Sequence, residues 1–225
     1  MKKNLIIIAA CAVMGTVGAH NVELMDFNDS ASYAIGRDIY NQWMQQNLGI
    51  NAQAAGQAMI DAAKGQSLLH DGQAIPLLQR FQEEFELRNN PAARENIEKG
   101  KKFMREISNN KSVYSTPSGL KYRRIKEGNG KHPKATDRVK VHYTGTLIDG
   151  KKFDSSVDRG EPITFPLNQV IPGWTEGLQI MDEGSKYILY IPYNLGYGVR
   201  GAGQDIPGGS TLIFEVELLE INPEK

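Results

Sequence analysis

The sequence is short of the residues on which thiol and redox chemistry depend. Cys11 is the one cysteine among 225 residues, and a single thiol excludes an internal disulfide framework, a Cys-x-x-Cys redox pair and a cysteine-rich zinc site. An excess of charge is lacking too, because 26 Lys and Arg residues balance 26 Asp and Glu residues. This balance gives no electrostatic reason to expect nucleic acid or anionic lipid as the main partner.

Motifs for nucleotide binding, metal binding and nucleophilic catalysis are absent as well. No Gly-x-Gly-x-x-Gly follows a strand pattern, and no phosphate-binding loop ends in Gly-Lys-Ser/Thr. The four histidines do not have metal-ligand spacing, and strand alternation turns His142 outward to solvent. Ser155 and Ser156 lack a plausible histidine partner for nucleophilic work. We therefore expect no metal, no other cofactor and no covalent chemistry.

The longest apolar run lies at the N-terminus and is too short for a membrane-spanning helix. A basic start, Met1–Asn4, precedes the apolar stretch Leu5–Val17 and the small-residue ending Val17-Gly18-Ala19. This pattern predicts a signal peptide over residues 1–19 and export to the periplasm or cell envelope of a bacterium. Because Ile8-Ala9-Ala10-Cys11 resembles a bacterial lipobox, a lipid anchor at Cys11 stays open as an alternative.

Residues 30–110 show helical periodicity and little β-branching. Ser30 is predicted to cap a first helix that ends at Gly49, and Asn51 is predicted to cap a second that ends at Gly65. Two thin helices bury little surface alone, so we expect residues 20–72 to form a helical dimerisation domain. Trp43, Met44 and Met59 then either pack in a core or face a second subunit.

A third helical pattern follows Asp71-Gly72 and is interrupted by Asn89-Asn90-Pro91. Asparagine followed by proline is typical of a helix start. The pattern predicts a long connecting segment over residues 73–112. It is either one helix kinked at Pro91 or two helices end to end.

The pattern changes at Thr116-Pro117-Ser118-Gly119, after which strand-like alternation begins. Val139, Val141 and Tyr143 alternate with polar residues, as in a half-buried strand. Trp174–Met181 is the only good helix candidate in this half. We predict an α+β domain over residues 113–225, an antiparallel sheet wrapped on one short helix. Its other expected strands are Leu120–Ile125, Lys151–Asp154, Lys186–Ile191 and Thr211–Ile221.

The candidate binding residues of this half are aromatic and branched aliphatic side chains at loop edges and strand ends. Spacing alone does not separate a concave apolar pocket from the core of a small domain, so both interpretations stay open at this point. Two polar groups, Asp154 and Arg159, stand beside them. The apolar members are Tyr143, Phe153, Phe165, Val170, Ile171, Trp174, Tyr197, Ile206 and Phe214.

Five motifs in this half occur in a shared order: Val141–Gly145, Gly150–Ser156, Val170–Trp174, Tyr197-Gly198 and Thr211–Leu218. Together they resemble the FKBP-type peptidyl-prolyl cis-trans isomerases, and the resemblance covers roughly residues 115–222. The helical half resembles the dimeric, two-domain bacterial branch of that family, the macrophage infectivity potentiator, FkpA and FklB type. In that branch the N-terminal helices intertwine, and a long helix carries each catalytic domain.

The resemblance implies a pocket for a prolyl side chain with the indole of Trp174 as its floor. It implies that the Tyr197 hydroxyl and the Ile171 amide bind substrate carbonyls, and that Arg159 pairs with Asp154 at the edge. Ile163 departs from the family, because many members carry an aromatic residue there. The implied catalytic residues are Tyr143, Asp154, Trp174, Tyr197 and Phe214. The implied substrate-binding residues are Phe153, Arg159, Phe165, Val170, Ile171 and Ile206.

The activity that the resemblance implies is acceleration of X-Pro isomerisation during the folding of exported proteins. The implied partners are proline-containing unfolded polypeptides, a second copy bound through the N-terminal helices, and the macrolide inhibitors of the family. Nucleic acid, metal and cofactor are not expected. One alternative stays open, a dimeric holdase that binds unfolded clients in its helical part, with isomerisation secondary.

Overall fold

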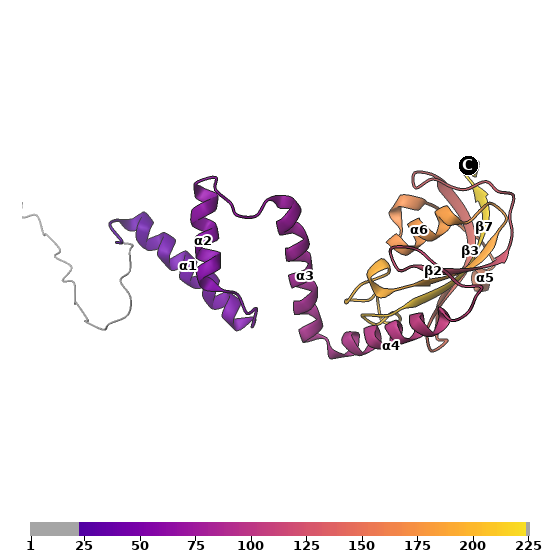
Figure 1. The fold of residues 1–225 in the computed structure, drawn as a ribbon, viewed down its shortest axis with the longest axis horizontal. Helices are drawn as coiled ribbons and strands as arrows, with labels where there is room; N and C mark the ends of the chain where they lie inside the picture. Colours follow the sequence, from indigo (N-terminus) through magenta and orange to yellow (C-terminus); the bar gives the residue numbers. More distant parts are fainter. Residues whose placement is uncertain (1–22, 224–225) are drawn as a thin grey trace, which may run out of the picture. The chain divides into compact units, whose positions relative to one another are not determined.

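A computed structural model describes residues 23–223, so the expected signal peptide and Cys11 lie outside the described residues. The chain divides into two compact units between Leu69 and His70 (Figure 1). The first unit is helical, and the second holds two further long helices and a β-sheet. No helix within residues 23–223 is both long and apolar enough to cross a membrane.

The first unit consists of α1 (Phe27–Gln45) and α2 (Ala52–Ala63). The prediction that Ser30 caps the first helix is wrong. Asp26 caps it instead, because its carboxylate accepts the Asp29 N–H at 2.8 Å, and α1 therefore begins three residues before Ser30.

The connection between these two helices was predicted in part. α1 ends at Gln45, ahead of Gly49, because Asn47 already takes the left-handed conformation with a φ of 52°. Asn51 caps α2 as predicted, since its Oδ1 accepts the Ala54 N–H at 3.0 Å. Local side-chain chemistry thus sets the start of both helices.

Neither helix of the first unit contains a buried side chain. Met44 is 57% exposed and Met59 is 54% exposed, so the interpretation of these residues as a core of this chain is wrong. Other large apolar side chains of the two helices are also exposed. They are Phe27, Tyr33, Ile35, Tyr40 and Ile60.

The second unit begins with α3 (Asp71–Asn89) and α4 (Pro91–Ile107). These are two helices end to end, not one kinked helix. Asn90 interrupts the helical backbone, and its side chain caps α4 by accepting the Ala93 N–H at 3.0 Å. Pro91 then occupies the first position of α4, where its missing N–H costs nothing.

The rest of the second unit is a seven-stranded antiparallel sheet in the order β1-β2-β6-β7-β3-β4, with β5 also paired to β3. One helix of functional importance, α6 (Pro172–Ile180), packs on it. The strands are β1 (Tyr114–Ser115), β2 (Lys121–Lys126), β3 (Arg138–Leu147), β4 (Lys152–Ser155), β5 (Ile163–Pro166), β6 (Lys186–Ile191) and β7 (Leu212–Ile221).

Five short elements were not predicted from the sequence. β1 and β5 are two and four residues long, and α5 (Ser156–Arg159) is a single turn. The 3-10 turns Leu167–Gln169 and Tyr193–Leu195 complete the unit. Elements this short carry too few periods of the hydrophobic pattern to be recognised.

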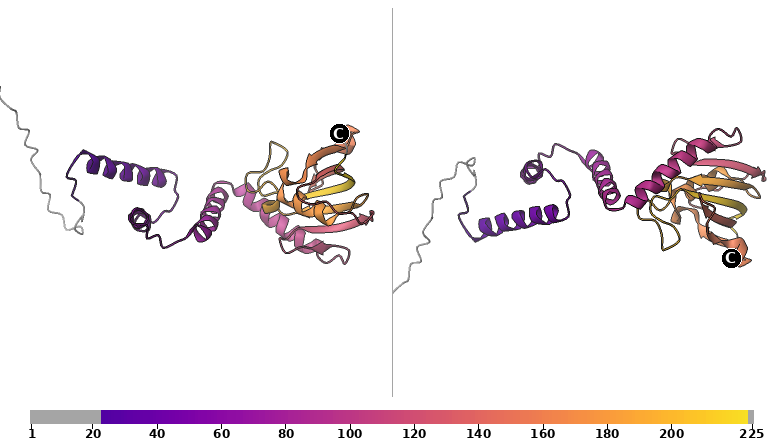
Figure 2. Two further views of the ribbon diagram at one scale, coloured as in Figure 1. Left: turned by 90° about the horizontal axis from the view of Figure 1, so that it is seen from above. Right: turned by 90° about the horizontal axis from the view of Figure 1, so that it is seen from below.

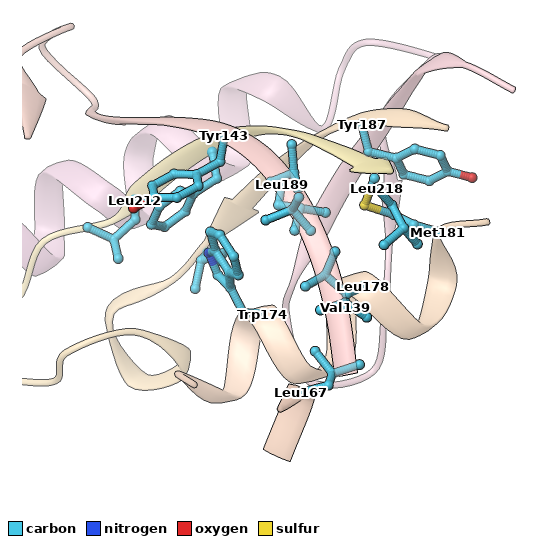
Figure 3. Packing of buried hydrophobic residues seen from close by; sticks show 14 of the residues in the cluster. Val139, Tyr143, Leu167, Trp174, Leu178, Met181, Tyr187, Leu189, Leu212 and Leu218 are labelled. Carbon is cyan, nitrogen blue, oxygen red and sulfur yellow. The ribbon is translucent and has the colours of Figure 1, made fainter. Parts of the chain in front are cut away.

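The core lies between α6 and the sheet. Figure 3 shows Trp174 and Leu178 among sheet side chains that include Val139 and Leu189. Gly173 allows this close contact, because a Cβ there would lie 2.4 Å from Cγ2 of Ile191. A larger residue would push the helix off the sheet.

Part of the opposite face of the sheet is covered by α4 (Figure 2). Leu189 of β6 faces α6, where its Cδ1 would lie 2.7 Å from a Cβ at Gly177. The next residue, Tyr190, points the other way and packs against Phe103 of α4 with ring centroids 6.0 Å apart. The two faces of the sheet therefore pack against different helices: α6 on the core side, and α4 on part of the other.

Candidate functional site

A cavity with a volume of about 780 Å³ opens beside α6. Every predicted site residue except Arg159 lines it. Its floor and walls come from β3, β4, β5, β7, the start of α6 and the loop between β6 and β7. Residues from all five predicted motifs are thus brought to one place.

The split edge of the sheet opens this cavity. β3 pairs with β5 up to Val141 and with β4 from Thr144 onward. Tyr143 lies in the interval, where neither edge strand covers β3, and its side chain points into the cavity. The two edge strands supply walls on either side, with Phe153 and Asp154 from β4 and Ile163 and Phe165 from β5.

Trp174 forms an aromatic cluster at the base of the cavity. Its indole is 5% exposed and meets Tyr143 and Phe214 edge-on, at centroid distances of 5.1 Å and 5.0 Å and interplanar angles of 86°. Phe165 is tilted against the indole at 5.4 Å. Such edge-to-face contacts hold the rings in fixed orientations, so the floor of the cavity is preorganised.

Gly145 on β3 makes room for two of these rings. A Cβ at this position would lie 2.6 Å from atoms of the Phe153 ring and 2.8 Å from Cε1 of Phe214. The two rings meet edge-on with centroids 5.4 Å apart. The glycine in the first family motif is therefore a steric requirement of the cavity wall.

The polar edge of the cavity is a three-residue network. The Tyr143 hydroxyl donates to Asp154, and Arg159 forms an ion pair with the same carboxylate. Arg159 also donates from Nη2 to the Tyr143 oxygen at 3.1 Å, with its guanidinium carbon 5.7 Å from the centre of the Tyr143 ring. Arg159 thus lies behind the cavity wall, where it holds Asp154 and Tyr143.

This network shifts the pKa values of its members. Burial acts to raise the pKa of Asp154, but the hydrogen bonds from Tyr143 and Arg159 outweigh it and lower the pKa below its usual value. Burial raises the pKa of Tyr143, and the bond to Asp154 adds to the rise. At neutral pH the edge therefore carries a carboxylate and a protonated phenol.

Two hydrogen-bond donors face the same cavity. Tyr197 is 39% exposed, and its pKa is raised first by burial and then by the charge of Asp154, so its hydroxyl stays protonated. The Ile171 N–H, just ahead of α6, donates to no backbone carbonyl of the described residues. Both groups are available to bind a carbonyl oxygen of a ligand.

His142 and Ser156 are closer than the sequence indicated. The prediction that Ser156 has no histidine partner is wrong, because His142 Nδ1 lies 3.0 Å from its Oγ, and His142 is half-buried. Ser156 is fully buried, however, and its Oγ accepts the Tyr143 N–H at 2.8 Å. The hydroxyl fixes the backbone at Tyr143 and cannot reach a substrate.

Five further residues line the cavity beyond the predicted set: Ile163, Gln169, Ala202, Gly203 and Asp205. The last three belong to the polar stretch Gly201–Asp205 of the loop between β6 and β7, which we call the flap. In this loop Ala202 and Ile206 exchange two backbone hydrogen bonds, of 2.9 Å and 3.2 Å, and Lys151 pairs with Asp205 at 3.0 Å. No pattern in the sequence indicated these pairings. No group of three metal-binding side chains occurs within residues 23–223.

The chain matches the sequence profiles of two domains that occur together. Residues 129–219 match the FKBP-type peptidyl-prolyl cis-trans isomerase domain. Residues 28–123 match the domain amino-terminal to FKBP-type peptidyl-prolyl isomerase. The first match contains every residue that lines the cavity, and the second spans the four long helices from the second residue of α1 onward.

Relatives are similar over most of the chain. An FKBP-type isomerase of Aeromonas hydrophila, FkpA, is 46% identical over 90% of this chain and 80% of its own. The FKBP-type 22 kDa isomerase of Escherichia coli is 46% identical over 85% of this chain and 94% of its own. The crystal structure of FkpA from Escherichia coli is 38% identical with a TM-score of 0.58, and the match covers 89% of this chain and 99% of that one.

Proposed function

The chain belongs to the family of FKBP-type peptidyl-prolyl cis-trans isomerases, and from this membership we propose how its residues catalyse the reaction and which chains it acts on. The reaction is rotation about an X-Pro amide bond. The barrier is about 18–20 kcal/mol for a peptide bond, because conjugation is lost in the twisted state. X-Pro bonds have sizeable cis populations but exchange slowly, so they limit the rate of folding.

The cavity favours the twisted amide over the planar one. A twisted amide is less polarised than a planar amide, so an apolar site stabilises it relative to water. The prolyl ring packs on the indole of Trp174, between the rings of Tyr143, Phe165 and Phe214. Binding that is tighter in the transition state than in the ground state lowers the barrier. This aromatic cluster is the observation that carries the proposal.

The polar groups orient the substrate backbone. Tyr197 donates its hydroxyl hydrogen to one carbonyl flanking the proline, and the Ile171 N–H donates to another. Asp154 stays ionised and, held by Arg159, faces the twisting bond from the edge of the cavity. Phe153, Val170 and Ile206 exclude water from the remaining sides. Fixed groups of this kind need no reorganisation during the reaction.

The test is a proline-limited refolding assay combined with an X-Pro peptide assay. Wild type accelerates both reactions. Tyr197→Phe removes one hydrogen bond and leaves the ring, so we expect about a tenfold loss of kcat/KM. If the Tyr197→Phe variant is as active as wild type, the role proposed for the Tyr197 hydroxyl is wrong.

The proposed clients and location of the protein rest on its sequence. We expect it to act on proline-containing chains in the bacterial periplasm or cell envelope after removal of residues 1–19, or at a membrane if Cys11 is lipidated. Mass spectrometry of the mature N-terminus decides between these outcomes. We also expect macrolide inhibitors of the family to occupy the cavity. Competition between such a macrolide and an X-Pro peptide tests this.

A homodimer through α1 and α2 is the second part of the proposal. The two helices expose large apolar side chains, among them Met44 and Met59, and bury none. A second copy would cover these faces. Analytical ultracentrifugation should give a dimer for wild type and a monomer for Met44→Glu/Met59→Glu. A wild-type monomer at micromolar concentration would contradict the proposal.

The same exposed faces favour a second function, the holding of unfolded clients. If they bind clients, Met44→Glu/Met59→Glu weakens aggregation suppression while peptide isomerisation stays at the wild-type rate. Trp174→Ala should instead weaken peptide isomerisation and leave aggregation suppression at the wild-type level. If Met44→Glu/Met59→Glu suppresses aggregation as well as wild type does, the exposed faces of α1 and α2 do not hold clients.

A further inference from the structure

One wall of the cavity is a long connection without regular strands. Between the end of β6 and the start of β7, it presents Tyr197, Ala202, Asp205 and Ile206 to the cavity. A loop needs support from outside if it is to hold a functional side chain in a fixed place. The helices α3 and α4 supply that support.

α4 fixes the loop on both sides of the flap. Asn96 Nδ2 donates to the Gly208 carbonyl at 2.9 Å, and Asn90 Nδ2 lies 3.5 Å from the Val199 carbonyl. Gly209 packs so closely on the helix that a Cβ there would lie 2.2 Å from the Ala93 carbonyl oxygen. The backbone before the flap and the backbone after it are therefore attached to one rigid element.

α3 holds the part of the loop that carries Tyr197. The Tyr193 hydroxyl donates to Glu83 Oε1 at 2.6 Å. Arg200 donates from Nε to Glu86 Oε1 at 2.8 Å, and Nη2 adds a second bond. Glu83 and Glu86 are three residues apart, so they lie on the same face of the helix. Their partners flank Tyr197 on both sides.

The environments of these pairs keep them formed at neutral pH. Burial, followed by the bond to Glu83, raises the pKa of Tyr193 to about 12, so its hydroxyl remains a donor. The hydrogen bond from Arg200 lowers the pKa of Glu86, whose side chain is only 24% exposed. The loop between β6 and β7, residues 192–211, is called the catalytic loop below. Both α3 carboxylates thus contact it from a half-buried helix face.

We propose that Glu83 and Glu86 are positioning residues of the isomerase: they hold Tyr193 and Arg200 and so fix the backbone that presents the Tyr197 hydroxyl to the substrate. This inference rests on the role of Tyr197 in the proposed function. It makes α3, the helix that follows the α1–α2 unit in the chain, a working part of the catalytic site. A purely structural role would instead leave the chemistry unchanged.

The test compares variants of the full chain in an X-Pro peptide assay. Glu83→Ala/Glu86→Ala should lower kcat about fivefold and change KM less, because misplacing a catalytic group affects mainly the transition state. The matched control is Glu84→Ala. Glu84 lies on the same helix and pairs with Arg80 at 3.0 Å on the exposed side, so its loss should leave kcat unchanged.

Conservative variants separate positioning from folding. Glu83→Gln keeps an acceptor for Tyr193 and should restore most of the activity that Glu83→Ala loses. The exchange Glu86→Arg/Arg200→Glu should likewise recover activity lost in either single variant. Fluorescence of Trp174 in a Trp43→Phe background reports the cavity, and we expect the Glu83→Ala/Glu86→Ala variant to change it.

A cycle with Tyr197→Phe decides whether the effect passes through that hydroxyl. In the Tyr197→Phe background, Glu83→Ala/Glu86→Ala should lower kcat little further, because the hydroxyl that Glu83 and Glu86 position is already absent. Full additivity of the two losses would overturn the inference, as would an unchanged kcat of Glu83→Ala/Glu86→Ala in an active wild-type background. An inactive wild type would overturn the proposed function itself, so the two failures are distinguishable.

Discussion

Two regions of this chain bury their apolar side chains to very different extents. In the sheet unit, α6 and the strands enclose side chains such as Leu178, Leu189 and Val216 at 0% exposure. In the α1–α2 unit, helices of good periodicity bury none of theirs. Burial of apolar area is the main favourable term in folding. The comparison indicates that the sheet unit is stabilised by its own contacts, whereas α1 and α2 leave their apolar side chains uncovered by the rest of the described chain.

The two tryptophans give the largest expected contrast between these regions. Trp174→Ala empties the cavity floor and removes a side chain that is 5% exposed. We expect a loss of roughly 3–5 kcal/mol in the free energy of unfolding and on the order of a 100-fold loss of kcat/KM. Trp43→Ala, in α1, should leave peptide isomerisation unchanged. Urea unfolding and the peptide assay measure both, and equal effects of the two variants would remove the contrast.

Replacing a helical glycine by alanine should change the free energy of unfolding in opposite directions at two positions. Gly173→Ala places a Cβ 2.4 Å from Cγ2 of Ile191, a stiff, buried side chain, and should destabilise the sheet unit by about 1–3 kcal/mol. Gly56→Ala in α2 meets nothing within 4 Å and should stabilise that helix by about 1 kcal/mol. Thermal unfolding measures both. Destabilisation by Gly56→Ala would instead place this glycine in a packed interface between copies.

The two asparagine caps test whether equal local chemistry has equal effects in both units. Asn51 and Asn90 each accept a backbone N–H at 3.0 Å, and replacement by alanine should cost about 1 kcal/mol at either site. Amide hydrogen exchange should become faster only in α2 when Asn51 is replaced. When Asn90 is replaced, it should become faster in α4 and in the catalytic loop. If exchange in the loop is unchanged in Asn90→Ala, the loop does not depend on α4.

The smallest expected effect is the response of the sheet unit to acid. The pKa values of Asp154 and Asp182 are lowered in the folded state, Asp182 chiefly by the hydrogen bond from the Gly130 N–H. A lowered folded pKa stabilises the fold above the ordinary value of 3.8. That stabilisation is lost as the pH falls through the folded pKa. Urea midpoints should therefore stay level from pH 7 to about pH 5 and fall below about pH 4. Asp182→Asn should flatten that fall, and a decline already at pH 6 would contradict this assignment.

Sequence patterns predicted the features that depend on neighbours along the chain. Asn51 and the Asn90-Pro91 pair act as helix starts because capping involves residues only three positions apart. The alternation of Val139, Val141 and Tyr143 correctly gave a strand with one buried face. Ser30 failed because Asp26 offered a competing cap within the same stretch.

The contacts that were missed join residues distant in sequence or lie in elements too short to have a pattern. His142 meets Ser156 because α5, a single turn, follows β4 back along β3. Arg159 pairs with Asp154, as the family resemblance implied, but its second bond, to the Tyr143 hydroxyl, was missed. Neither spacing nor composition indicates such geometry.

By itself, the sequence determined the α+β class of the catalytic half, the family motifs and ten of the fifteen residues that line the cavity, because each depends on local periodicity or on residue type at a fixed position. Only the tertiary structure decided where the charges and the supporting contacts lie. It joined Glu83 to Tyr193 and Glu86 to Arg200 across more than a hundred residues. Such pairings depend on how helices pack on loops, and a single chain's residue pattern carries no record of that packing.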